Sequence, residues 1–223
     1  MTPEIDNVGV AILKGACNPE AKDLAVDLGQ FELGAVFDES VLKKVPVIKS
    51  VIACRKTWVA IRDHLFLRKV AEFLAARPRL TEPEKQAFIN EHLNDPHKAK
   101  KLGDSLVLIL DRLDDMEKPQ MIAKSFGAFA RGKICFDIFR RLSAAIDIGF
   151  IGDLREFSKI DPVLENPPPR IDEPTRLLRM NLLRTGLTGI KRSTGITPIT
   201  GVGFEATELG RVFKQCMNDA NTV

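Results

Sequence analysis

The sequence is poor in the residue types from which metal and cofactor sites are usually built. It has only four cysteines, three histidines and one tryptophan, and it has no tyrosine. Because no CxxC or CxxxH spacing occurs, the sequence predicts no zinc site. The cysteines lie far apart and no secretory signal opens the chain, which argues against a disulfide framework and predicts a reducing, cytoplasmic location.

Long apolar runs and known catalytic motifs are also missing. The run Leu106–Leu110 is far shorter than the ~20 apolar residues of a membrane-spanning helix. Residues 201–206 fit the pattern GxGxxA, but only 17 residues follow, too few for the strand–helix–strand unit of a dinucleotide site. GxSxG, P-loop and HExxH patterns are absent, and each histidine is interpreted as a surface or packing residue. The sequence therefore predicts no catalytic residue, metal or cofactor.

What the sequence does contain is helical periodicity with strong boundary signals. A helix is predicted from Asn18, and a longer one from Pro46 to about Ala76. Thr81 to Glu84 form a capping box. Further helices follow the stop at 94–96, begin near Pro119 and span about 137–148, and the short connections favour antiparallel packing. Eight apolar residues of these last three helices are expected to share one core: Leu106, Leu110, Leu113, Ile122, Phe126, Phe139, Leu142 and Ile146.

The fold class that follows is mainly α, with three parts. Residues 1–160 are predicted to form a multi-helix domain. Residues 161–174 hold Pro162, Pro167, Pro168, Pro169 and Pro174 and indicate a stiff linker. Residues 175–223 are predicted to form a small α+β unit: a helix over 176–185, a hairpin of 186–192 with 199–206, and a last helix capped by Thr207.

Charge is unevenly distributed near the N-terminus. Residues 1–42 carry eight acids and two lysines, whereas residues 43–69 carry eight basic residues and one acid. The basic helix either forms a solvated face, or pairs with the acidic segment, or meets anionic lipid or nucleic acid. We expect the acidic segment to shield it. A second cluster, Asp111, Asp114 and Asp115, shares one helix face, and we interpret it as structural, through pairing with Arg140 and Arg141 or capping of the next helix.

The C-terminal part resembles the end of a winged-helix domain. Leu183-Arg184-Thr185-Gly186-Leu187 would end a recognition helix, a hairpin would form the wing, and Ala206-Thr207-Glu208-Leu209-Gly210 would start the closing helix, with Ala206 where that pattern usually has leucine. The six basic and two acidic residues of 168–192 are compatible with phosphate contacts. The resemblance implies either nucleic-acid binding or a protein contact.

A wider resemblance is to a family of uncharacterised bacterial proteins. It rests on Leu110–Lys118, Gly132–Ile134, Phe139–Leu142 and Ile146-Asp147, with Val45-Pro46-Val47 upstream and the turn at 206–210 downstream. It would cover roughly residues 43–155 and 176–213. The resemblance implies no activity and carries over no catalytic residue. It favours a bacterial or mobile-element origin, and hence a role in stress response or in defence such as phage defence.

These observations lead to a non-enzymatic interaction or regulatory protein that has a protein partner or forms a homo-oligomer. The alternatives are a nucleic-acid-binding regulator that uses the C-terminal unit, and a peripheral membrane effector that uses the basic helix of residues 43–69. The residues predicted to meet nucleic acid or an anionic surface are Lys43, Lys44, Lys49, Arg55, Lys56, Arg62, Arg176, Arg179, Arg184, Lys191 and Arg192.

Overall fold

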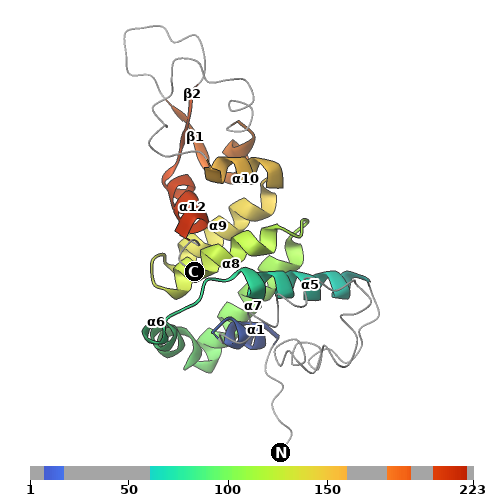
Figure 1. The fold of residues 1–223 in the computed structure, drawn as a ribbon, viewed down its shortest axis with the longest axis vertical. Helices are drawn as coiled ribbons and strands as arrows, with labels where there is room; N and C mark the ends of the chain where they lie inside the picture. Colours follow the sequence, from blue (N-terminus) through green and yellow to red (C-terminus); the bar gives the residue numbers. More distant parts are fainter. Residues whose placement is uncertain (1–7, 18–60, 160–179, 192–202, 220–223) are drawn as a thin grey trace, which may run out of the picture. The chain divides into compact units, whose positions relative to one another are not determined.

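The computed structural model describes residues 8–17, 61–159, 180–191 and 203–219 of the 223-residue chain (Figure 1). These residues are mainly helical, with a small two-stranded sheet near the C-terminus. The sequence predicted both features. The chain divides into two compact units, and the division falls between Ile134 and Cys135.

The first unit is built from helices alone in the residues that the structure describes. Helix α1 packs against α7, and α5 packs against α8. Between α5 and α7 in the sequence, α6 continues into a π-helical turn, η2, which contacts α7. The bounds are α1 Val8–Cys17, α5 Ile61–Ala76, α6 Glu82–Phe88, η2 Ile89–Leu93, α7 Pro96–Arg112 and α8 Lys118–Ala130.

The ends of these helices are set by the residues that predicted them. The Thr81 hydroxyl accepts the Glu84 N–H, and the Glu84 carboxylate accepts the Thr81 N–H at 2.8 Å, so the capping box is confirmed. Asp95 caps α7 by accepting the N–H of His97 at 2.8 Å. Gly132, with φ of 69°, follows α8 in the left-handed conformation that glycine adopts without strain.

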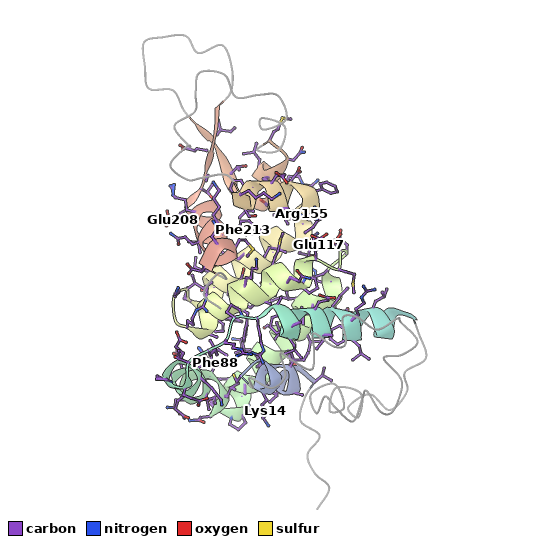
Figure 2. All side chains as sticks on the ribbon, viewed as in Figure 1. Lys14, Phe88, Glu117, Arg155, Glu208 and Phe213 are labelled. Carbon is purple, nitrogen blue, oxygen red and sulfur yellow. The ribbon has the colours of Figure 1, made fainter. Side chains whose placement is uncertain are left out.

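Phenylalanine rings fill the centre of the first unit. Phe126 of α8 makes edge contacts with Phe73 of α5 at 5.5 Å and with Phe88 of α6 at 5.7 Å between ring centroids. Phe129, one turn further along α8, also meets Phe88 edge-on at 5.7 Å. Offset edge contacts of this kind stabilise a core beyond the area they bury. The cluster therefore joins three helices, and Phe88 marks its position in Figure 2.

Helix α1 was not predicted from the sequence. Its residues are apolar on almost every side, and Ile12 and Leu13 are fully buried. Such a segment shows little amphipathic periodicity, so its sequence resembles a short buried strand as much as a helix. Gly9 lies directly against Gly103 of α7, where a Cβ on Gly103 would come within 2.6 Å of the Gly9 backbone. The two glycines thus permit a close crossing of α1 and α7.

The second unit combines helices with the hairpin. Figure 1 shows α12 following directly from β2. Phe157 of α10 stacks with Phe213 of α12, with ring centroids 6.1 Å apart. Figure 2 labels Phe213. The bounds are α9 Phe136–Ile148, α10 Ile151–Lys159, the 3-10 helix η4 Leu182–Thr185, β1 Thr188–Lys191, β2 Gly203–Ala206 and α12 Glu208–Asn218.

The eight residues predicted to share one core are all buried. Five of them, from Leu106 to Phe126, lie in the first unit and the other three in the second, and the sharing of one core by all eight stays a prediction. Helix α9, which carries Phe139, packs against η4 and α12. Helical periodicity shows which side of a helix is buried but not which partner covers that side, so this division was not visible in the sequence.

Several predictions fall on residues that the structure does not describe. They are the helix from Asn18, residues 46–60 of the helix 46–76, the shielding of 43–69 by the acidic segment, and the linker 161–174. The described end of the long helix, α5, stops at Ala76 as predicted. The domain boundaries at 160 and 175 border this undescribed region and stay a prediction.

Core packing in α7 is tested by two leucines on opposite sides of the helix. Leu110 is fully buried, whereas Leu108 is 64% exposed. We expect Leu110→Ala to lower the free energy of unfolding by about 2–5 kcal/mol, because it removes buried methyl groups and leaves a cavity. Leu108→Ala is the matched control and should change stability little. Equal denaturation midpoints for the two variants would contradict the packing of α7.

Candidate functional site

The C-terminal elements form a tightly connected hairpin module. The 3-10 helix η4 ends at Gly186, whose φ of 74° turns the chain toward β1. Strands β1 and β2 are antiparallel, with Thr188 opposite Ala206 and Ile190 opposite Phe204. The predicted hairpin is thereby confirmed, in a register that sets its two faces.

Thr207 clamps the base of this hairpin to the start of α12. Its N–H donates to the Leu187 carbonyl at 3.0 Å, and its hydroxyl donates to the Gly186 carbonyl at 2.6 Å. The same hydroxyl accepts the Gly210 N–H at 3.1 Å, which is the N-cap predicted from the sequence. A Cβ on Gly210 would collide with the Leu187 carbonyl, so glycine lets α12 approach closely. These hydrogen bonds fix the base of the hairpin relative to the start of α12.

A buried cation lies beside the ring stack of this unit. The Lys214 side chain is 1% exposed, and its Nζ lies 4.5 Å from the centroid of the Phe157 ring. The negative face of an aromatic ring attracts an ammonium group, and this attraction is strongest away from water. Lys214 therefore contributes to the packing of α12 against α10.

Large apolar side chains are exposed on the second unit. Phe150 is 71% exposed at the corner between α9 and α10, and Ile148 is close to it in sequence and half exposed. On β1, Thr188 is buried while Ile190, two residues on and thus on the same face, is 60% exposed. Met180, which precedes η4, is also exposed. Sequence reasoning missed this set, although an apolar residue at a corner between two glycines, Gly149 and Gly152, was a signal.

Of the predicted anion-binding residues, three lie in the described part of the chain. Arg184 is exposed in η4, and Lys191 occupies the β1 position opposite Gly203. Arg62 lies in α5 of the first unit. The other eight fall outside the described residues, so the set as a whole stays a prediction: Lys43, Lys44, Lys49, Arg55, Lys56, Arg176, Arg179 and Arg192.

One member of the basic segment has a structural contact. Lys69 of α5 donates from Nζ to the backbone carbonyl of Asp111, at the end of α7, at 2.9 Å. This bond crosses between two packed helices of the first unit. The last residue of the basic segment therefore contributes to packing within the first unit.

The acidic group near Asp114 also has local structural contacts. The Asp114 carboxylate accepts from Lys118 Nζ at 2.6 Å, and the Lys118 side chain is 2% exposed. This hydrogen bond is the main reason why the pKa of Asp114 lies below its ordinary value. Asp115 accepts the Glu117 N–H at 2.7 Å just before α8. Local contacts of two of the three carboxylates are thus structural, and the partner of Asp114 is Lys118 rather than the expected Arg140 or Arg141.

His92 belongs to the aromatic cluster of the first unit. Its ring lies 5.0 Å from that of Phe88 and 4.9 Å from that of Phe129. Burial lowers the pKa of His92, the Glu91 carboxylate opposes this shift, and Lys98 adds to it. In the residues that the structure describes, no three His, Cys, Asp or Glu side chains gather as metal ligands would. His92 is therefore interpreted as a packing residue, as the sequence suggested.

The pKa shift of His92 has a consequence for stability. Because the folded pKa lies below the ordinary value of 6.5, the fold favours neutral imidazole. We expect the free energy of unfolding to fall as the pH drops from about 7.5 to 5.5, through the range in which histidine titrates. His92→Phe should weaken this dependence, because it removes the titrating imidazole from the aromatic cluster. An unchanged pH dependence in His92→Phe would contradict the assignment.

The clamp at Thr207 is tested by removing its hydroxyl. Thr207→Ala loses both the N-cap and the bond to Gly186, and should lower the free energy of unfolding by about 0.5–2 kcal/mol. Thr207→Ser keeps the hydroxyl and should retain most of the stability. The measurement is equilibrium denaturation followed by circular dichroism, and equal losses in both variants would assign the effect to the methyl group instead.

Among the helices that the structure describes, none has the length and apolar character to span a membrane.

Comparisons with known proteins add no family to this description. No protein-family model matches the chain, and no curated protein and no solved structure shows a significant match to it.

Proposed function

We propose that this protein is a non-enzymatic interaction or regulatory protein whose C-terminal unit contacts a protein partner. The exposed apolar side chains of that unit carry the proposal: Phe150 at 71% exposure, with Ile148, Met180 and Ile190. Protein contacts commonly centre on aromatic and aliphatic side chains that are exposed in the free protein. A role in bacterial stress response or defence belongs to the same proposal and rests on the family resemblance alone.

The geometry around Ile190 supports a contact element that is held in place before binding. Ile190 follows the buried Thr188 on one face of β1, so this face extends past the core of the unit. The Thr207 clamp holds the base of the hairpin in place. A surface that is held before binding loses less conformational entropy on association.

The test compares matched variants of the full chain for partner capture from extracts of its own source and for self-association. Phe150→Ser should lose a specific partner, or a dimer seen by sedimentation, that the unchanged chain retains. Leu108→Ser is the control, because Leu108 is also an exposed apolar residue but lies in the first unit. Equal loss in both variants, or a chain that is monomeric and captures no specific protein, would reject the proposal.

A nucleic-acid-binding regulator is the second candidate. It is favoured by Arg184, which is exposed in η4 immediately before the hairpin, and by the basic position Lys191 on β1. Basic residues on a helix and an adjoining hairpin are suited to phosphate contacts. Arg184→Ala should then weaken binding to duplex DNA uniformly across sequences and reduce its salt dependence. Salt-independent or absent binding would leave the protein contact as the only proposal.

A further inference from the structure

Exposed apolar side chains are concentrated in the second unit. Six large apolar side chains are exposed in the described residues, and four of them belong to this unit: Ile148, Phe150, Met180 and Ile190. Single apolar side chains on a surface need no explanation, whereas several on one unit mark a contact site. Two of the four, Phe150 and Met180, each lie close in sequence to a charged residue, and these two charges have opposite signs.

The first of these places is the corner between α9 and α10. It consists of Phe150 and Asp153, which we call the corner surface. The Phe150 carbonyl accepts the Leu154 N–H at 3.0 Å, so Phe150 directly precedes α10. A Cβ on Gly152 would lie 2.8 Å from Phe150 Cε1, which places the ring against the glycine backbone. The ring is therefore supported from below although it is 71% exposed.

The second place is the helical turn that precedes β1. It presents Met180 and Arg184, which we call the turn surface. Leu182 and Thr185 of this turn are buried, so the exposed Met180 and Arg184 lie on its outward side. The Thr185 hydroxyl donates to the Leu182 carbonyl at 2.6 Å and accepts the Leu187 N–H at 3.2 Å. These two bonds hold the turn in its conformation.

The charges of the two surfaces have no partners within the described chain. Neither Asp153 nor Arg184 forms a side-chain hydrogen bond or salt bridge with any residue in the described ranges. Other charges of this unit pair locally, such as Lys159 with Glu156 at 2.7 Å. An acid in the first turn of a helix stabilises that turn. The Asp153 carboxylate nevertheless stays open to a cation from outside.

The corner surface and the turn surface are chemically complementary. A guanidinium group pairs with a carboxylate and also stacks on an aromatic ring, and a thioether packs favourably against such a ring. A second copy of the chain supplies both surfaces at once, and a twofold arrangement forms the contact twice. We propose that the protein self-associates through its second unit, with the corner surface of one copy against the turn surface of the other.

This inference rests on the proposed function, because it names a second copy as the protein partner. The two fail separately. A chain that stays monomeric but captures a different protein, and loses it in Phe150→Ser, overturns the inference and leaves the proposed function intact. A chain that is monomeric and captures no specific protein rejects both.

The first test is charge reversal, followed by sedimentation velocity of the full chain over a concentration series. Asp153→Lys and Arg184→Glu each place like charges opposite one another in the dimer. Each should raise the dimer Kd about tenfold or more. The matched controls are Asp137→Lys and Arg141→Glu, which reverse exposed charges on α9 of the same unit. Asp137, like Asp153, lies in the first turn of its helix. Both controls should dimerise like the unchanged chain.

Mixing the two reversed variants gives the sharpest outcome. In a mixed dimer, Lys at position 153 of one copy faces Glu at position 184 of the other, while the second contact keeps the original Asp153 and Arg184. Equimolar Asp153→Lys and Arg184→Glu should therefore form a heterodimer although neither forms a homodimer. No association in the mixture, or equal loss in the controls, would overturn the proposal.

Neutral variants cover the case in which a reversal lowers the melting temperature. Asp153→Asn and Arg184→Gln remove the charges without creating repulsion. Each should raise the dimer Kd by a smaller factor than the corresponding reversal. An unchanged Kd in both neutral variants would overturn the proposal.

The support of the Phe150 ring is tested by adding one methyl group. The three atoms nearest to a Cβ on Gly152 all belong to the Phe150 ring, so Gly152→Ala displaces the ring and nothing else nearby. Self-association should weaken, while the melting temperature stays unchanged or rises because alanine favours a helix over glycine. An unchanged dimer Kd in both Gly152→Ala and Phe150→Ser would overturn the proposal.

Discussion

The ring of Phe126 is the contact on which the first unit depends. It meets Phe73, Phe88 and Phe129 at centroid distances of 5.5 to 5.9 Å and so joins α5, α6 and α8. The chain has one tryptophan and no tyrosine, so phenylalanine provides almost all of its aromatic packing. The second unit repeats this solution with the stacked rings of Phe157 and Phe213. Each unit therefore has its own aromatic centre, as expected of elements that bury their apolar sides separately.

The sequence predicted those parts of the fold whose cause is local. Thr81, Asp95 and Thr207 each accept backbone N–H groups at the start of a helix, and each was recognisable from its own neighbours. The hairpin was predicted from two short stretches separated by the turn residues Gly195 and Pro198. Signals of this kind depend on a few adjacent residues, so they hold whatever the rest of the chain does.

Features that depend on distant residues were not predictable. Helix α1 is buried on nearly all sides, and the contact of Gly9 with Gly103 joins residues far apart in sequence. Phe150 is exposed because no described part of the chain covers its side chain. Helical periodicity does not show which element, if any, covers a given residue. Of the candidate binding residues, only Arg62, Arg184 and Lys191 lie in the described chain.

Among the residues that the structure describes, two buried lysines make the two units chemically distinguishable. Lys118 lies at the start of α8 in the first unit and Lys214 within α12 in the second, and neither side chain is more than 2% exposed. An amine-reactive reagent dissolved in water modifies exposed lysines at once, but reaches these two amines only when the surrounding unit opens. Each unit therefore contains an internal reporter of its own opening, so labelling kinetics read by mass spectrometry would reveal whether the two units unfold together or one at a time.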